Sequence, residues 1–150
     1  MPMLAFTDRG ILPEGVHDCT LLEAQQLLCL NQHRTTIWNG LLGFLQWASI
    51  YPLPDSYLLD GSFVTDKTLP GDIDVVVDIT SCDETARRQW FEAWFLNRQH
   101  SKDAFHVDFY PFVVGEGKDF SAFFQYVRVE DAFLRGLEPS VRKGILRVVK

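Results

Sequence analysis

Two aspartates flank one isoleucine at the start of an apolar run, and a Gly-Ser pair precedes them in the chain. The pair is Gly61-Ser62, and Asp72-Ile73-Asp74 leads directly into Val75-Val76-Val77. A strand that begins with two carboxylates places charge beside an apolar core, where the charge must be paired or must bind a metal ion. Asp72 and Asp74 are two residues apart, so in a strand their side chains point to the same face. This stretch is therefore the first candidate for a chemical site.

A third carboxylate, Asp108, lies in a second predicted strand over residues 104–112, where polar and apolar residues again alternate. If the two strands are neighbours in a suitable register, three carboxylates meet at one edge of the sheet. Carboxylates this close repel one another and raise one another's pKa unless cations lie between them. Hard divalent ions take such oxygen ligands. Asp72, Asp74 and Asp108 are therefore the predicted ligands of Mg²⁺ or Mn²⁺.

Gly61 and Ser62 are the predicted phosphate-binding half of the site. A glycine lets the backbone come close to a phosphate, and backbone N–H groups and the Ser62 hydroxyl can hydrogen-bond to it. Two divalent ions held by carboxylates can activate an attacking oxygen and neutralise a leaving pyrophosphate. The two halves together indicate chemistry on a nucleotide phosphate.

The order of these residues resembles a known signature. Gly61-Ser62, nine residues, Asp72-Ile73-Asp74 and a later strand aspartate, Asp108, are similar to the motif of the polymerase-β-type nucleotidyltransferase superfamily. The resemblance covers residues 56–110. The chain length is similar to that of minimal nucleotidyltransferases, which lack the helical domain of larger members. The segments 12–17 and 143–146 also resemble an uncharacterised group of small stand-alone proteins of this superfamily.

The resemblance implies a metal-dependent enzyme that transfers a nucleoside monophosphate from an NTP, with ATP expected, to an acceptor hydroxyl. By the same resemblance, Asp72 and Asp74 hold Mg²⁺, Asp108 completes the site and helps to activate the nucleophile, and Gly61 and Ser62 hold the triphosphate. The acceptor stays open between a partner protein, a small RNA and a small molecule. Minimal members often occur in toxin–antitoxin pairs, which makes a partner protein one of the expected acceptors.

Two other interpretations stay open. The chain could be a non-catalytic module that binds a nucleotide in the same pocket, or a partner protein through aromatic residues, since 12 Phe and 4 Trp exceed what a small core needs. Alternatively, the aspartates could form a solvated rim of the sheet. Five further polar residues are interpreted as turn, surface or structural residues: His17, Asp60, Lys67, Asp78 and His106.

Composition narrows the class of protein. The 150 residues are 47% hydrophobic and 23% charged, which fits one globular domain over residues 1–150. No apolar run approaches the roughly 18 residues of a membrane span. The start of the chain lacks signal-peptide features, and three cysteines without a Cys-x-x-Cys pair disfavour disulfides, so a cytoplasmic location is expected.

Charge is unevenly distributed along the chain. The net charge is −6; residues 1–117 hold 7 Lys and Arg against 16 Asp and Glu, a net of −9, and residues 118–150 hold 7 against 4, a net of +3. An acidic body does not attract bulk nucleic acid. This balance disfavours nucleic-acid binding along the body and suits a divalent-cation site.

The periodicity of apolar residues predicts an α+β fold, with a small mixed or antiparallel sheet and helices packed mainly on one face. Residues 1–19, punctuated by proline and glycine, are predicted to be an irregular arm. Helices are predicted over residues 21–30, 33–50, 83–100 and 118–135. Strands are predicted over residues 56–60, 72–79, 104–112 and 144–149. Capping-box patterns at Thr20-Glu23 and Ser81-Glu84 predict two helix starts.

Overall fold

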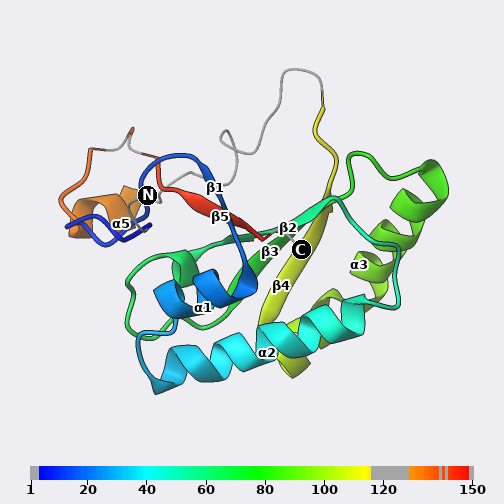
Figure 1. The fold of residues 1–150 in the computed structure, drawn as a ribbon, viewed down its shortest axis with the longest axis horizontal. Helices are drawn as coiled ribbons and strands as arrows, with labels where there is room; N and C mark the ends of the chain where they lie inside the picture. The colour runs from blue at the N-terminus through cyan, green and yellow to red at the C-terminus, as the bar shows by residue number, and fades with distance from the viewer. Residues whose placement is uncertain (1–3, 116–128, 139, 141, 149–150) are drawn as a thin grey trace.

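Five strands form one mixed sheet in the order β1-β5-β2-β3-β4 (Figure 1). The computed structural model describes residues 4–115, 129–138, 140 and 142–148. The outer pairs β1–β5 and β3–β4 are parallel, and β2 pairs antiparallel with β5 and β3. The strands are β1 Val16–Cys19, β2 Ser56–Asp60, β3 Ile73–Asp78, β4 Val107–Phe112 and β5 Ile145–Val148. The predicted α+β class with a mixed sheet is confirmed.

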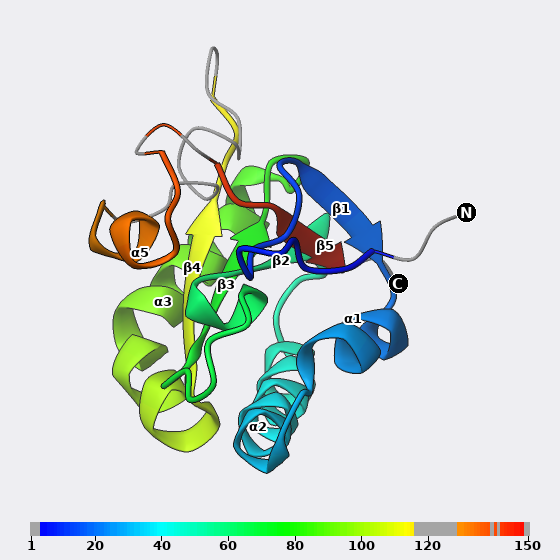
Figure 2. The same cartoon turned by 90° about the vertical axis from the view of Figure 1, so that its left-hand side faces the viewer.

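Three helices pack on one face of this sheet (Figure 2). The described helices are α1 Leu21–Leu28, α2 Gln32–Ala48, α3 Glu84–Phe105 and α5 Val129–Leu134, with a 3₁₀ turn, η1, at Ser62–Val64. Alternate strand residues such as Leu59, Val75 and Phe109 face α1, α2 and α3 and are fully buried with Phe44 of α2. The residues between them on each strand face the opposite side of the sheet. No helix in the described part of the chain is long and apolar enough to cross a membrane.

The end of α3 lies against α2 at a glycine. A Cβ atom at Gly40 would stand 2.2 Å from the carbonyl oxygen of Phe105, so a side chain there would separate the two helices. His106 then ends α3 in the left-handed conformation, with φ of 56°. α3 thus ends at Phe105, five residues beyond the end predicted from the sequence at residue 100. For the same reason β4 begins at Val107 rather than at residue 104.

Other boundaries also differ from the prediction. Residues 16–19 of the predicted irregular arm are strand β1, because they pair with β5. The N-cap of α3 is Asp83, whose side chain accepts a hydrogen bond from Ala86 N, and not Ser81. The capping box at Thr20 is confirmed. Of the predicted helix over residues 118–135, residues 118–128 lie outside the described residues, and α5 occupies the remainder.

Candidate active site

Three carboxylates lie side by side on adjacent strands. Asp74 on β3 is the direct register partner of Asp60 on β2 and of Asp108 on β4. Their neighbours along each strand belong to the helix-side core, so these three residues, the carboxylate row, face the other side of the sheet. The condition set from sequence, that the strands of Asp74 and Asp108 be neighbours in a suitable register, is met. Asp60, interpreted from sequence as a cap or turn acceptor, is also the third member of the row.

The Gly-Ser turn lies directly on this row. Gly61 has φ of +82°, and a Cβ atom there would be 2.5 Å from Asp74 Oδ2. Only glycine combines this backbone conformation with such a close approach to a carboxylate. Ser62 begins η1, is partly exposed, and its hydroxyl donates to no described residue. Asp72 is half-buried immediately before β3 and adds its charge to the row.

A buried arginine holds the loop between the two halves of the motif. Arg34 of α2 is fully buried and donates hydrogen bonds to the carbonyl oxygens of Leu28, Phe63 and Lys67. Its guanidinium also stacks over the Phe63 ring, 4.5 Å from the ring centroid. These contacts fix the chain on either side of the turn that follows Ser62. The backbone between the Gly-Ser pair and Asp72 is thereby anchored to the helical layer.

Crowding of the carboxylates changes their acidity. Burial, followed by repulsion from Asp72, Asp60 and Asp108, raises the pKa of Asp74 to about 7. Burial also raises the pKa of Asp60, while Lys143 opposes the rise. A carboxyl group that is half protonated near neutral pH and surrounded by other carboxylates is a strong candidate for cation binding.

Lys143 lies against the Gly-Ser turn, and sequence analysis did not assign it a role. Its ammonium is 3.2 Å from the carbonyl oxygen of Gly61 and 3.7 Å from Asp60 Oδ1, and its side chain is 12% exposed. The pairing of the two ends of the chain brings it there. Gly144 N donates to the carbonyl of Leu12, and Ile145 N donates to that of Gly15. The segments 12–17 and 143–146 thus pair with each other and carry Lys143 into the site.

Arg98 of α3 holds the outer end of the row. Its Nε is 3.0 Å from Asp108 Oδ1, and a second guanidinium nitrogen is 3.3 Å from Oδ2. The guanidinium also lies over the Trp94 ring, 5.6 Å from the ring centroid. The Arg98 side chain is 48% exposed, so water screens the pair and the arginine has room to move.

The oxygen atoms of the carboxylate row and of Asp72 are of the kind that a hard cation binds. When ionised, Asp60, Asp72, Asp74 and Asp108 carry four negative charges, and Lys143 and Arg98 carry two positive ones, which leaves two negative charges. Carboxylate oxygens in excess over cations are the ligands that Mg²⁺ prefers. The described residues nevertheless contain no group of three or more His, Cys, Asp or Glu placed to hold a metal ion. The row is therefore not a finished coordination shell, and Asp108 could join one only by leaving Arg98.

The model of a family of unknown function, DUF6932, matches residues 4–149. The chain belongs to the DUF6932 family. No curated protein and no solved structure gives a significant match. The DUF6932 match includes the carboxylate row, the Gly-Ser turn and both of the end segments that place Lys143.

The other polar residues considered in this DUF6932 chain lie outside the row. Lys67 is exposed, and His106 is the exposed cap of α3 rather than a strand residue. A ring nitrogen of His17 lies 2.7 Å from the carbonyl oxygen of Pro13. Asp78 is buried and accepts hydrogen bonds from the backbone N and the hydroxyl of Thr80. The interpretation of Asp78 as structural agrees with these contacts.

Proposed function

We propose that the protein is a metal-dependent nucleotidyltransferase that transfers a nucleoside monophosphate from an NTP, with ATP expected, to an acceptor hydroxyl. The observation that carries this proposal is the register of Asp74 with Asp108, directly beside the Gly61-Ser62 turn. The turn offers a backbone approach and a hydroxyl that donates to no described residue, and the row offers carboxylates for a cation. The two halves of the sequence motif therefore lie within contact of each other.

Each residue has a role in this proposal. Asp72 and Asp74 hold Mg²⁺ or Mn²⁺, which when bound would neutralise charge on the phosphates. The Ser62 hydroxyl donates to a phosphate oxygen, and Gly61 leaves room for the triphosphate. Asp108, freed from Arg98, completes the metal site and accepts the proton of the acceptor hydroxyl.

The bond changes follow from these positions. The acceptor oxygen bonds to the α-phosphorus while the bond between the α-phosphorus and the bridging oxygen breaks, and pyrophosphate leaves. The acceptor is proposed to be a partner protein, as in a toxin–antitoxin-type system, a small RNA or a small molecule. The partner-protein case predicts modification of one particular protein when a lysate is supplied.

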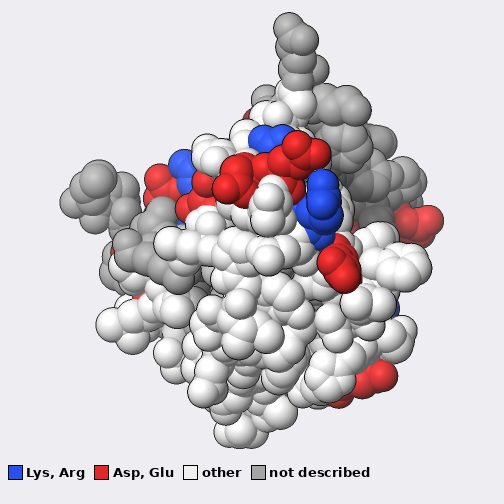
Figure 3. All heavy atoms as spheres, turned by 90° about the vertical axis from the view of Figure 1, so that its right-hand side faces the viewer, with Lys and Arg blue, Asp and Glu red and all other residues white. Residues whose placement is uncertain are grey.

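A second candidate is a non-catalytic module that binds a nucleotide or a partner protein. The ion pair with Arg98 favours it, because that pair occupies both oxygens of Asp108. Large apolar side chains also lie exposed on the side of the molecule that carries α3, among them Phe95 (79%) and Leu96 (67%). Figure 3 shows that charged side chains gather toward one edge of this side and leave a wide region with few charges.

A transfer assay separates the two candidates. The protein is incubated with each α-labelled NTP and Mg²⁺ or Mn²⁺, with and without lysate. Wild type and Asp103→Asn, which alters an exposed aspartate of α3 outside the row, are expected to transfer label. Asp74→Asn is expected to lose at least about 100-fold of that transfer. Tight nucleotide binding without transfer to any acceptor would favour the module instead.

A further inference from the structure

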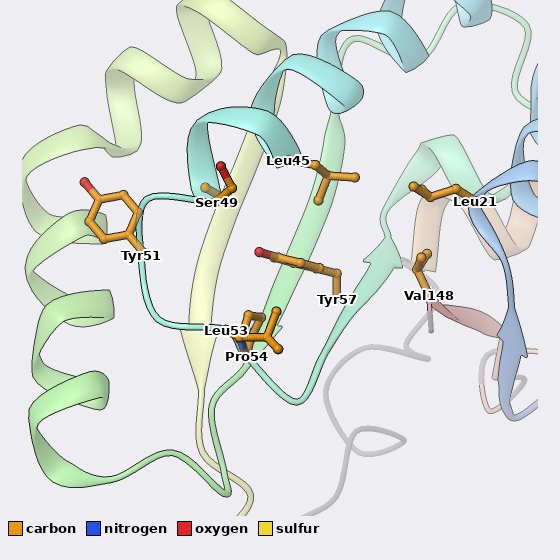
Figure 4. Close-up of a pocket in the computed structure, with 9 residues that line it drawn as sticks. Leu21, Leu45, Ser49, Tyr51, Leu53, Pro54, Tyr57 and Val148 are labelled. Atoms are coloured by element: carbon orange, nitrogen blue, oxygen red, sulfur yellow. The ribbon is translucent and has the colours of Figure 1, made fainter. Parts of the chain in front are cut away.

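A cavity of about 280 Å³ opens on the helix side of the sheet, away from the carboxylate row (Figure 4). It lies between α1, the end of α2, and the strands β2 and β5. No Asp, Glu, Lys or Arg is among the described residues that line it. Its apolar walls include Leu21, Leu45, Leu53, Pro54 and Val148.

Tyr57 places a hydroxyl group in this apolar space. The residue is only 7% exposed, and its ring stands edge-on to Phe44, with 6.4 Å between the ring centroids. Figure 4 shows the hydroxyl directed into the space between Ser49 and Leu53. The hydroxyl makes no hydrogen bond to a described residue, and it is not among the fully buried side-chain atoms that lack a partner, so it is accessible from the cavity. Burial raises the pKa of Tyr57 to about 12, so the group is a neutral donor at physiological pH.

The neighbouring polar side chains do not accept a hydrogen bond from the Tyr57 hydroxyl. Ser49 Oγ donates to the carbonyl oxygen of Gln46 at 2.6 Å, and it accepts no hydrogen bond from the Tyr57 hydroxyl. The hydroxyl of Tyr51 points away from the cavity (Figure 4). The Tyr57 hydroxyl is therefore a donor without a partner among the described residues, and an acceptor atom of an occupant could reach it from the cavity.

We propose that this cavity is a binding site for a small, uncharged, largely apolar molecule that carries one hydrogen-bond acceptor. An apolar cavity of about 150 Å³ binds benzene, so the larger space here fits a molecule of two fused rings. A charged ligand is disfavoured, because its lost hydration would find no opposite charge among the lining residues. The acceptor atom is placed on the Tyr57 hydroxyl, and the rings lie against the leucine side chains.

The size and chemistry of the cavity suggest a matched pair of probes. 1-Indanone has two fused rings and a carbonyl acceptor, and indane has the same ring skeleton without the acceptor. Each is titrated into the full chain while backbone amide signals are recorded by NMR. We expect 1-indanone to bind with a Kd on the order of 0.1–1 mM, with shifts around Tyr57. We expect indane to bind about 3–10-fold more weakly.

Two single-atom variants test the proposed hydrogen bond. Tyr57→Phe removes only the hydroxyl, so its fold should match wild type by circular dichroism. It should weaken 1-indanone binding about 3–10-fold and leave indane binding unchanged. Tyr51→Phe, the control, should change neither.

Three results would overturn the proposal. One is the absence of binding by either probe up to its solubility limit. The second is equal affinity of wild type and Tyr57→Phe for 1-indanone. The third is a set of shifts around Tyr57 that depends on protein concentration and not on the probe, because a second copy of the chain would then fill the cavity.

Discussion

Asp74 lies directly opposite Asp108 across the parallel ladder of β3 and β4, and its other register partner, Asp60, is also a carboxylate. Three carboxylates in a line across a sheet repel one another, and partial burial strengthens the repulsion. Asp60 and Asp108 each have a cation partner and Asp74 makes no ion pair with a described residue, so the fold would gain stability by replacing Asp74 with a neutral residue. Such a costly arrangement is therefore expected where the carboxylates bind a ligand or take part in catalysis. Its cost can be measured as a change in the free energy of unfolding, without knowing the substrate.

The first prediction is that Asp74→Asn stabilises the fold at alkaline pH. Because the folded-state pKa is about 7 and the ordinary value is 3.8, the folded chain binds this proton more tightly than the unfolded chain does. Stability associated with this proton is fully present below about pH 4 and is lost as the pH rises toward 7. The full shift corresponds to at most about 4 kcal/mol. We expect Asp74→Asn to raise the free energy of unfolding by about 2–4 kcal/mol at pH 8.

Urea denaturation at pH 8 and pH 4.5, with EDTA present, measures this effect. At pH 4.5 the wild type and the variant should differ by less than about 1 kcal/mol, because the carboxyl group is then mostly protonated in the folded chain. Added Mg²⁺ should narrow the gap at pH 8 if the row binds it, since a ligand of the folded state stabilises that state. Equal stability differences at the two pH values would show that the carboxylates do not crowd Asp74.

The alternation of residues along the strands was sufficient to predict half of this site. It placed Asp72 and Asp74 before an apolar strand and Asp108 on a strand of matching phase, and the register of β3 with β4 agrees. It did not place Asp60 in the row, because the partner of the last residue of β2 depends on how β2 and β3 align. That alignment follows from tertiary pairing and not from local pattern.

The two cations could not be predicted for a related reason. Lys143 and Gly61 are 82 positions apart, and only the pairing of β5 with β1 and β2 brings them together. Arg98 on α3 and Asp108 on β4 are ten positions apart, and they meet only because the chain reverses at His106, the left-handed cap of α3. The N-cap of α3 was assigned to the wrong residue because Ser81 and Asp83 both suit an N-cap, and the capping-box spacing favoured the serine.

The second prediction is that Gly61→Ala damages the site. A methyl group there would collide with the Asp74 carboxylate, and φ of +82° is unfavourable for alanine. We expect the free energy of unfolding to fall by about 1–3 kcal/mol and the proposed transfer activity to be lost. Gly71→Ala is the control, because a Cβ atom at Gly71 has nothing within 4 Å. If thermal melts and transfer assays cannot tell the two variants apart, the close packing of the turn on Asp74 is wrong.

The third prediction concerns the buried pair of Lys143 and Asp60. Lys143→Met removes the cation and leaves Asp60, which is 7% exposed, without its ion-pair partner. Breaking such a pair from one side is expected to reduce the free energy of unfolding at pH 8 by about 2–4 kcal/mol. Adding Asp60→Asn should recover most of the loss, because no charge is then left unpaired. Additive losses in the double variant, measured by urea denaturation, would argue that the two residues do not interact.

The fourth prediction is that Arg98 competes with a metal ion for Asp108. Arg98→Gln frees both carboxylate oxygens from the guanidinium, so the affinity for Mn²⁺ should rise about 3–10-fold, measured by electron paramagnetic resonance of the free ion. The expected size follows from an ion pair of about 1 kcal/mol at a half-exposed position. Arg88→Gln is the matched control, since Arg88 pairs with Glu84 on the exposed surface of the same helix at 3.7 Å. Arg98 would have to release Asp108 before that carboxylate could bind a cation. An unchanged Mn²⁺ affinity in Arg98→Gln would therefore show that Asp108 is not one of the proposed metal ligands. Asp72 and Asp74 would then be left to hold the ion.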